Sequence, residues 1–152
     1  MIKVLFVCHG NICRSPMAEF LMKDELKKAG IDKEVFVASA ATSTEEIGNM
    51  PHSGTRRKLA EFNISTNGKY AIQMSADDYL RYDYIFGMDS YNIKNILSIT
   101  GGDPEQKIAR LLDITDAPGD VDDPWFTGDF DKTYTDIKKG IDALMKIIKE
   151  KL

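Results

Sequence analysis

Residues 2–16 read IKVLFVCHGNICRSP, and this stretch decides the fold. Ile2–Val7 is a continuous apolar run with β-branched residues, the pattern of a strand that is buried on both faces. Pro16 suits the first turn of a helix, where its missing N–H costs nothing. The helix that it opens carries an apolar stripe and ends at Gly30. The sequence therefore predicts a strand, a short loop and a helix in this order.

The rest of the chain repeats the alternation of strand and helix. Strands are predicted at Val35–Ala38, Tyr84–Met88 and Ile108–Leu112, helices at about 55–62, 75–80, 90–99 and 134–152, and a loop over Asp113–Asp129. The short helix after Ser75 would open with a capping box formed by Ser75 and Asp78. Such alternation implies an α/β fold with a parallel sheet that helices cover on both faces. Ligands of such sheets bind beyond the carboxyl ends of the strands, where Cys8 lies.

The composition is that of an ordinary globular protein. The chain has 152 residues, of which 43% are apolar and 29% charged, and we expect one domain over residues 1–152. A net charge of −4 argues against nucleic acid as a partner. The apolar run that stops at Val7 is too short for a signal peptide or a membrane span. We therefore expect a cytoplasmic monomer that binds neither nucleic acid nor membrane.

The two cysteines lie in the first thirteen residues, where they cannot form a disulfide framework for the whole chain. Their position in the loop between strand and helix argues for chemistry instead. A loop that leads into a helix N-terminus presents unpaired N–H groups and the positive end of a dipole, which together bind anions. Gly10 permits a close backbone approach, and Asn11 tolerates the left-handed conformation.

Arg14 and Ser15 complete this anion site. Arg14 is six residues beyond Cys8, and its planar fork suits bidentate contact with phosphate. Ser15 offers a hydroxyl donor to the Cys8 sulfur, and a thiol among such donors ionises readily. Cys8 alone would read as a buried cysteine, and Arg14 alone as a helix-start arginine. Their spacing between a strand and a helix favours an activated nucleophile in an oxyanion cradle.

The segment VCHGNICRSP (residues 7–16) closely resembles the start of the low-molecular-weight protein tyrosine phosphatases. The likeness extends along nearly the whole chain, through SAAT (39–42), IGN (47–49) with Pro51, YDYI (82–85) with Met88, Asp89 and Asn92, and DPW (123–125). The resemblance implies a flavodoxin-like fold with a four-stranded parallel sheet and helices on both faces. It also implies a phosphocysteine intermediate, no metal and no cofactor. The implied substrate is a phosphotyrosine protein or a small aryl phosphate, and the product is inorganic phosphate.

A general acid must protonate the leaving oxygen of the substrate. The candidates in the late loop are Asp113, Asp116, Asp120, Asp122 and Asp123. The residues themselves do not choose among these five carboxyl groups, whereas the resemblance selects Asp123. Trp125 and Phe126 can then form an aromatic wall for a substrate ring.

Cys13 lies five residues after Cys8 in the same loop. The resemblance implies that the two cysteines are a redox pair in which a disulfide protects the nucleophile; the alternative is that Cys13 is a small buried apolar residue. The cysteines with His9 and His52 also raise the possibility of zinc, but the spacing lacks the usual paired ligands.

Three further residues are assigned supporting or selective roles. Asp89 follows a buried strand and is expected to hold Arg14 by a charge pair. Ser39 is expected to support the loop through Asn11. Ile12 stands where phosphoarginine-specific relatives have Thr, and it is the phosphotyrosine-type residue.

The chain departs from the family pattern at three places. GKYA (68–71) stands where many relatives have His-x-Ala-Arg, so that part of the supporting network is in question. Glu45 forms one side of the cleft where relatives often have an aromatic residue. His9 replaces Leu or Thr and either adds positive charge at the cleft mouth or is a solvated loop histidine.

Two other functions compete on the same loop. A thiol-dependent arsenate reductase would need cysteines outside the loop or an external thiol partner. A non-catalytic phosphate-binding redox sensor that uses Cys8 and Cys13 is disfavoured because Arg14, Ser15 and Asp123 are all present.

Overall fold

The computed structural model describes residues 1–152. Its elements in chain order are β1 (Ile2–Cys8), α1 (Arg14–Lys28), β2 (Val35–Ala41), α2 (Ser53–Ala60), α3 (Asp78–Arg81), β3 (Tyr84–Gly87), α4 (Ser90–Thr100), β4 (Ile108–Arg110), the 3₁₀ turn η1 (Leu111–Ile114), α5 (Pro124–Thr127) and α6 (Phe130–Lys151). No helix in the structure is both long enough and apolar enough to cross a membrane.

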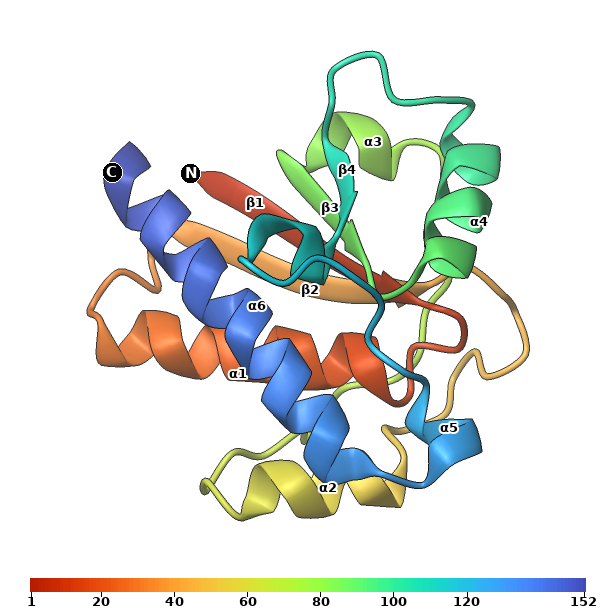
Figure 1. Ribbon diagram of the computed structural model, residues 1–152, viewed down its shortest axis with the longest axis vertical. Helices are drawn as coiled ribbons and strands as arrows, with labels where there is room; N and C mark the ends of the chain where they lie inside the picture. The colour runs from red at the N-terminus through yellow and green to blue at the C-terminus, as the bar shows by residue number, and fades with distance from the viewer.

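The four strands form one parallel sheet in the order β2-β1-β3-β4. β1 lies in the middle, with Val4 opposite Val37 of β2 on one side and Tyr84 of β3 on the other. Parallel strands need crossover connections, and the helices between the strands supply them (Figure 1). The predicted four-stranded α/β fold is confirmed.

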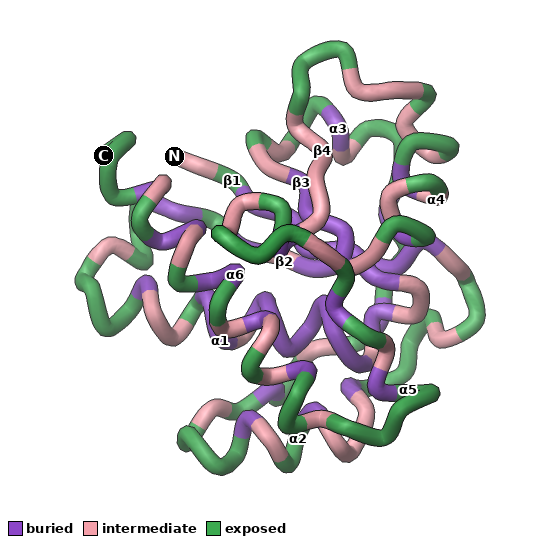
Figure 2. Tube along the Cα trace, in the orientation of Figure 1, coloured by how far each residue is buried: buried purple, intermediate pink, exposed green.

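Helices cover both faces of the sheet, which explains why β1 is apolar and buried without a break from Val4 to Cys8. Val4, Phe6 and Cys8 point into the larger core, which α1 and α6 complete. Leu5 and Val7 point into a smaller core on the other face, beneath α4. Buried positions accordingly follow β1 and α1 in Figure 2. Cys8 is thus the last residue of a strand that is fixed from both sides.

The end of the sheet differs from the sequence expectation. The predicted strand Ile108–Leu112 is wrong at its end, because β4 stops at Arg110 and a 3₁₀ turn follows. Asp113 draws the chain into that turn by accepting hydrogen bonds from the Arg110 N–H at 3.3 Å and from the Arg110 Nε–H at 3.0 Å. The side chains of Leu111 and Leu112 are then buried under α6 instead of extending the sheet.

The predicted loop Asp113–Asp129 is also wrong in part, because it contains the short helix α5. Asp123 caps this helix by accepting a hydrogen bond from the Trp125 N–H at 3.0 Å, and Pro124 occupies its first turn. Gly128 ends it in the left-handed conformation, at φ 71°. The predicted capping box at Ser75 is only half formed. The Ser75 N–H donates to the Asp78 side chain, but the residue in the N-cap position is Asp77 and not Ser75.

Gly140 lets the middle of α6 approach η1 closely. A Cβ at this position would lie 2.4 Å from Cγ of the fully buried Leu111. The Gly140→Ala variant should therefore lower the free energy of unfolding by about 1–3 kcal/mol, because overpacking outweighs the better helix propensity of Ala. Urea unfolding measures this change. Exposed Lys139→Ala in the same helix is the control and should stay within about 0.5 kcal/mol of wild type. An equally or more stable Gly140→Ala protein would contradict this account of the packing.

Candidate active site

The side chain of Asn11 holds the loop between β1 and α1 in its curled shape. Asn11 lies in the left-handed region at φ 58° and is completely buried. Its Nδ2 donates to Ser15 Oγ at 2.7 Å and to Ser39 Oγ at 2.9 Å. Its Oδ1 accepts a hydrogen bond from the Ile72 N–H at 3.2 Å. Because each polar group of this amide is bound, the loop is fixed to α1, to β2 and to the segment after α2.

Cys8 lies at the inner end of this loop with its sulfur facing the start of α1. Ser15 Oγ is 3.0 Å from Cys8 Sγ, and the Ser15 N–H donates to the sulfur at 3.4 Å. Ser15 Oγ already accepts from Asn11, so its own hydrogen is available for the sulfur. Two hydrogen-bond donors therefore face the buried sulfur.

Arg14 is buried, and one edge of its guanidinium is fixed by neighbours. Nη1 donates to Asp89 Oδ2 at 2.7 Å and to the Val121 carbonyl at 2.8 Å, while Nη2 lies 3.4 Å from Asp123 Oδ2. Burial alone would lower the pKa of Arg14, but Cys8 and the hydrogen bond to Asp89 outweigh it and raise the pKa. Nε is buried and has no hydrogen-bond partner. An orphan cationic donor beside the Cys8 sulfur suits an anion such as phosphate.

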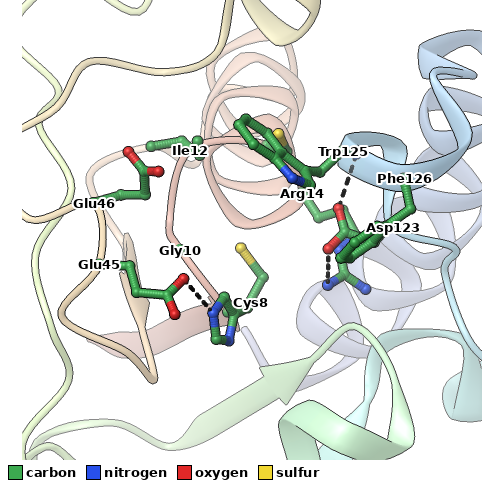
Figure 3. A pocket seen from close by; sticks show the side chains of 11 residues that line it. Cys8, Gly10, Ile12, Arg14, Glu45, Glu46, Asp123, Trp125 and Phe126 are labelled. Carbon is green, nitrogen blue, oxygen red and sulfur yellow. Dashed lines mark hydrogen bonds and ion pairs between the residues drawn. The ribbon is translucent and has the colours of Figure 1, made fainter.

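A cavity of about 300 Å³ opens over the loop. Its lining combines the loop, the β2–α2 connection and the α5 segment: Cys8, His9, Gly10, Ile12, Cys13, Arg14, Glu45, Glu46, Asp123, Trp125 and Phe126. Figure 3 shows the Cys8 sulfur pointing into this space, with Trp125, Phe126 and Asp123 on one side and Glu45 and Glu46 on the other. Both predicted walls of the cleft, Glu45 and the pair Trp125 and Phe126, therefore border the same cavity as Cys8, the predicted nucleophile.

Of the five carboxyl candidates, only Asp123 lines this cavity. Asp113 and Asp120 form ion pairs with Arg110, each at 2.9 Å. Asp122 faces outward to Lys132 at 3.7 Å, and Asp116 is exposed. The geometry therefore separates Asp123 from its neighbours.

The rim of the cavity contains contacts that the sequence did not indicate. Glu46 lines the cavity and accepts a hydrogen bond from Asn49 at 2.6 Å, while Glu45 pairs with His9 at 2.8 Å. His9 thus reaches an acidic partner across the mouth instead of being free in solvent. Both contacts depend on the path of the loop after β2, for which the local sequence carries no signal.

His52 supports the α5 segment. Its ring lies edge-on to Trp125 at 5.8 Å between centroids and stacks on Phe130 at 5.2 Å. Its Nδ1 accepts a hydrogen bond from the Gly54 N–H, which caps α2. His52 therefore connects the aromatic wall to α2, and its imidazole packs against the aromatic rings of Trp125 and Phe130.

Cys13 lines the same cavity as Cys8, and both cysteines are free thiols. Burial, with the nearby Cys8 second, raises the pKa of the Cys13 thiol to about 12. Cys13 therefore stays protonated at neutral pH.

Comparison with known proteins identifies the family. A family model described as "Low molecular weight phosphotyrosine protein phosphatase" matches residues 3–152. The "Low molecular weight protein-tyrosine-phosphatase YfkJ" of Bacillus subtilis is 41% identical in an alignment of 152 residues that covers 99% of this chain and 97% of the relative. The crystal structure of YfkJ covers 99% of this chain and 96% of its own, with a TM-score of 0.96.

Two further solved structures share the fold. The low molecular weight protein tyrosine phosphatase SP-PTP of Streptococcus pyogenes is 40% identical, covers 96% of this chain and 92% of its own, and has a TM-score of 0.86. A drosophila arginine phosphatase is 27% identical, covers 97% and 98%, and has a TM-score of 0.88. The chain therefore belongs to the low molecular weight phosphotyrosine protein phosphatase family and is an enzyme of that type.

Proposed function

We propose that this enzyme hydrolyses phosphotyrosine and other aryl phosphate monoesters through a phosphocysteine intermediate on Cys8. The observation that carries the proposal is the shared cavity, which the Cys8 sulfur, the Arg14 guanidinium and the Asp123 carboxyl border together. A nucleophile, an anion-binding donor and a proton donor are the parts that displacement at phosphorus needs. The relatives named as tyrosine phosphatases support this substrate class.

In the first step the Cys8 thiolate attacks phosphorus. The S–P bond forms while the bond from phosphorus to the aryl oxygen breaks, and Asp123 gives its proton to that oxygen. Arg14 Nε–H and the backbone N–H groups of the loop meet the charge on the phosphoryl oxygens. These donors are held before substrate arrives, so they need little reorganisation as charge develops.

In the second step water attacks the phosphocysteine. Asp123, now a carboxylate, takes a proton from the water as the S–P bond breaks and inorganic phosphate forms. The Cys8 thiolate returns to the hydrogen bonds of Ser15, which make it a better leaving group. One carboxyl group thus serves as acid and then as base.

The walls of the cavity favour an aryl substrate. The side chains of Trp125 and Phe126 are exposed beside the cavity, and Ile12 contributes apolar surface from the loop. A phenyl ring between these groups would place its phosphoryl group over Cys8. The acidic rim of Glu45 and Glu46 favours a substrate with positive charge near the phosphate, so phosphoarginine is the second candidate. Hydrolysis of phosphotyrosine, phosphoserine and phosphoarginine peptides at equal concentration ranks the two.

The cysteine pair supports redox control of this activity. Peroxide would convert the Cys8 thiolate to a sulfenic acid with release of hydroxide. The Cys13 thiol would then displace water and form a disulfide, which removes the nucleophile reversibly.

We further propose that the enzyme is a cytoplasmic, single-domain monomer that binds neither nucleic acid nor membrane. Arsenate reduction would need an external thiol, since the chain has two cysteines.

The Cys8→Ser variant should lack turnover of para-nitrophenyl phosphate in the presence of EDTA yet still bind inorganic phosphate. The serine hydroxyl is a far weaker nucleophile, whereas the donors of the loop remain. Acid-quenched wild-type enzyme should carry phosphate on Cys8, which mass spectrometry detects. Substantial turnover by Cys8→Ser would refute the mechanism.

The Asp123→Asn variant should lower the rate on phenyl phosphate by roughly 10²-fold or more, because the poor leaving group needs a proton. Para-nitrophenyl phosphate should suffer less, since its leaving group needs little protonation. Asp122→Asn, which changes an exposed neighbour, is the matched control. If Asp122→Asn loses the rate and Asp123→Asn keeps it, the acid is the neighbouring residue.

Wild-type enzyme treated with peroxide should lose activity and about 2 Da of mass, and a dithiol should restore both. The Cys13→Ala variant should keep much of its activity but recover poorly after the same dose, because Cys8 proceeds to the sulfinic acid. Intact-mass analysis measures both outcomes. Oxygen added to Cys8 in the wild-type protein, without a disulfide, would reject the redox pair.

A further inference from the structure

A buried acidic side chain lies behind the Cys8 loop, on α1. Glu19 is 4% exposed, and its carboxylate contacts the ammonium groups of two lysines. Lys23 Nζ approaches Glu19 Oε2 at 2.5 Å from the solvent side, with its own side chain 46% exposed. Lys69 Nζ lies 3.3 Å from Glu19 Oε1, and its side chain is 11% exposed. The two cations therefore differ in burial although they share one carboxylate.

Lys69 also bonds directly to β2. Its ammonium donates to the Ser39 carbonyl at 2.8 Å, next to its contact with Glu19. Burial lowers the pKa of Lys69, and the Glu19 carboxylate opposes that shift. An ammonium that is this enclosed keeps its charge through its partners, and removal of one partner from such a pair is costly. Lys69 and Glu19 are therefore interdependent.

A chain of hydrogen bonds joins this ion pair to the nucleophile, and its direction is determined. Asn11 Nδ2 gives one hydrogen to Ser39 Oγ and the other to Ser15 Oγ. Each hydroxyl then has one hydrogen left to donate. Ser39 gives its hydrogen to Glu19 Oε1 at 2.5 Å.

Ser15 is the last member of the chain. Its hydrogen can go to Cys8 Sγ at 3.0 Å or to the Ala40 carbonyl at 3.5 Å. The shorter contact and the negative charge of the thiolate favour the sulfur. Glu19 accepts from Ser39 at the far end of the chain, and the Ile72 N–H holds the Asn11 amide in the same sense, so these two contacts together maintain the direction of the chain.

We propose that Lys69 is a positioning residue that, with Glu19, keeps the Ser39–Asn11–Ser15 hydrogen bonds in the direction that points the Ser15 hydroxyl hydrogen at Cys8. Lys69 touches neither the substrate cavity nor the reacting atoms and acts through Glu19 and Ser39. The proposal rests on the proposed role of Cys8 as nucleophile. It explains why a buried carboxylate stands close to a thiolate that it would otherwise repel.

The test compares Lys69→Met with Lys23→Met, which removes the other cation from the same carboxylate. The readouts are kcat, KM and the pH midpoint of Cys8 alkylation by iodoacetamide. Lys69→Met should lower kcat about tenfold with little change in KM and move the midpoint to higher pH, because the thiolate loses a hydrogen bond. Lys23→Met should stay within about twofold of wild type, because its exposed pair contributes little.

Glu19→Met, which removes both the charge and the acceptor oxygen, separates positioning from simple electrostatics. Loss of a negative charge near Cys8 would by itself stabilise the thiolate and move the alkylation midpoint to lower pH. Loss of the acceptor for Ser39 should instead move it to higher pH, as in Lys69→Met. The other groups that face Cys8 are unchanged in all variants: Arg14, Cys13, Asp123 and, at the rim, His9, Glu45 and Glu46.

Circular dichroism verifies that each variant is folded. If Lys69→Met or Glu19→Met does not fold, Ser39→Ala breaks the same chain with the ion pair intact and should show the same upward shift. Equal midpoints for Lys69→Met and Lys23→Met, or a lower midpoint for Glu19→Met, would overturn the proposal. Alkylation does not require turnover, so an inactive wild-type enzyme would refute the proposed function while the midpoints still decide the role of Lys69.

Discussion

The side-chain amide of Asn11 is the constraint on which the site depends. Its three hydrogen bonds join the loop to Ser15 on α1, to Ser39 on β2 and to the Ile72 backbone. The left-handed backbone at φ 58° costs free energy that these bonds offset. Without these three hydrogen bonds, no side chain would hold the loop in its curled shape, and the backbone N–H groups of the loop would not point into one space. The curled shape of the loop therefore depends on one buried polar side chain whose hydrogen-bonding groups are all satisfied.

Arg14 extends the same order to the other side of the cavity. Its Nη1 binds Asp89, which caps α4, and the Val121 carbonyl, two residues before Asp123. The Val121 N–H in turn donates to the Met88 carbonyl at 2.8 Å, at the end of β3. One guanidinium thus links the Cys8 loop to the segment that carries Asp123. Lys has a single point charge and could not make these contacts together with a free Nε donor.

The sequence predicted those features of the fold that depend on residues close together in the chain. The apolar run of β1 and the loop that follows are contiguous, so fold class and anion site could be read from residues 2–16. The predicted end of β4 is wrong and the helix α5 was not predicted. In each case one side chain redirects the backbone, Asp113 after β4 and Asp123 at the start of α5. Local pattern did not distinguish Asp123 from Asp120 and Asp122, since Arg110 and Lys132 are brought to those two neighbours only by the fold.

Two ion pairs stabilise the surroundings of the loop, and in each pair the two residues lie far apart in the sequence. Asp89 meets Arg14 across 75 residues, and Lys69 meets Glu19 from the segment where the family histidine is missing. In a chain of net charge −4, distant charges would repel a phosphate dianion, and salt screens them beyond about 10 Å. Attraction must then come from donors at contact distance whose orientation is fixed in advance. The buried pairs Arg14–Asp89 and Lys69–Glu19 are costly to desolvate, and each fixes the orientation of groups around the Cys8 loop.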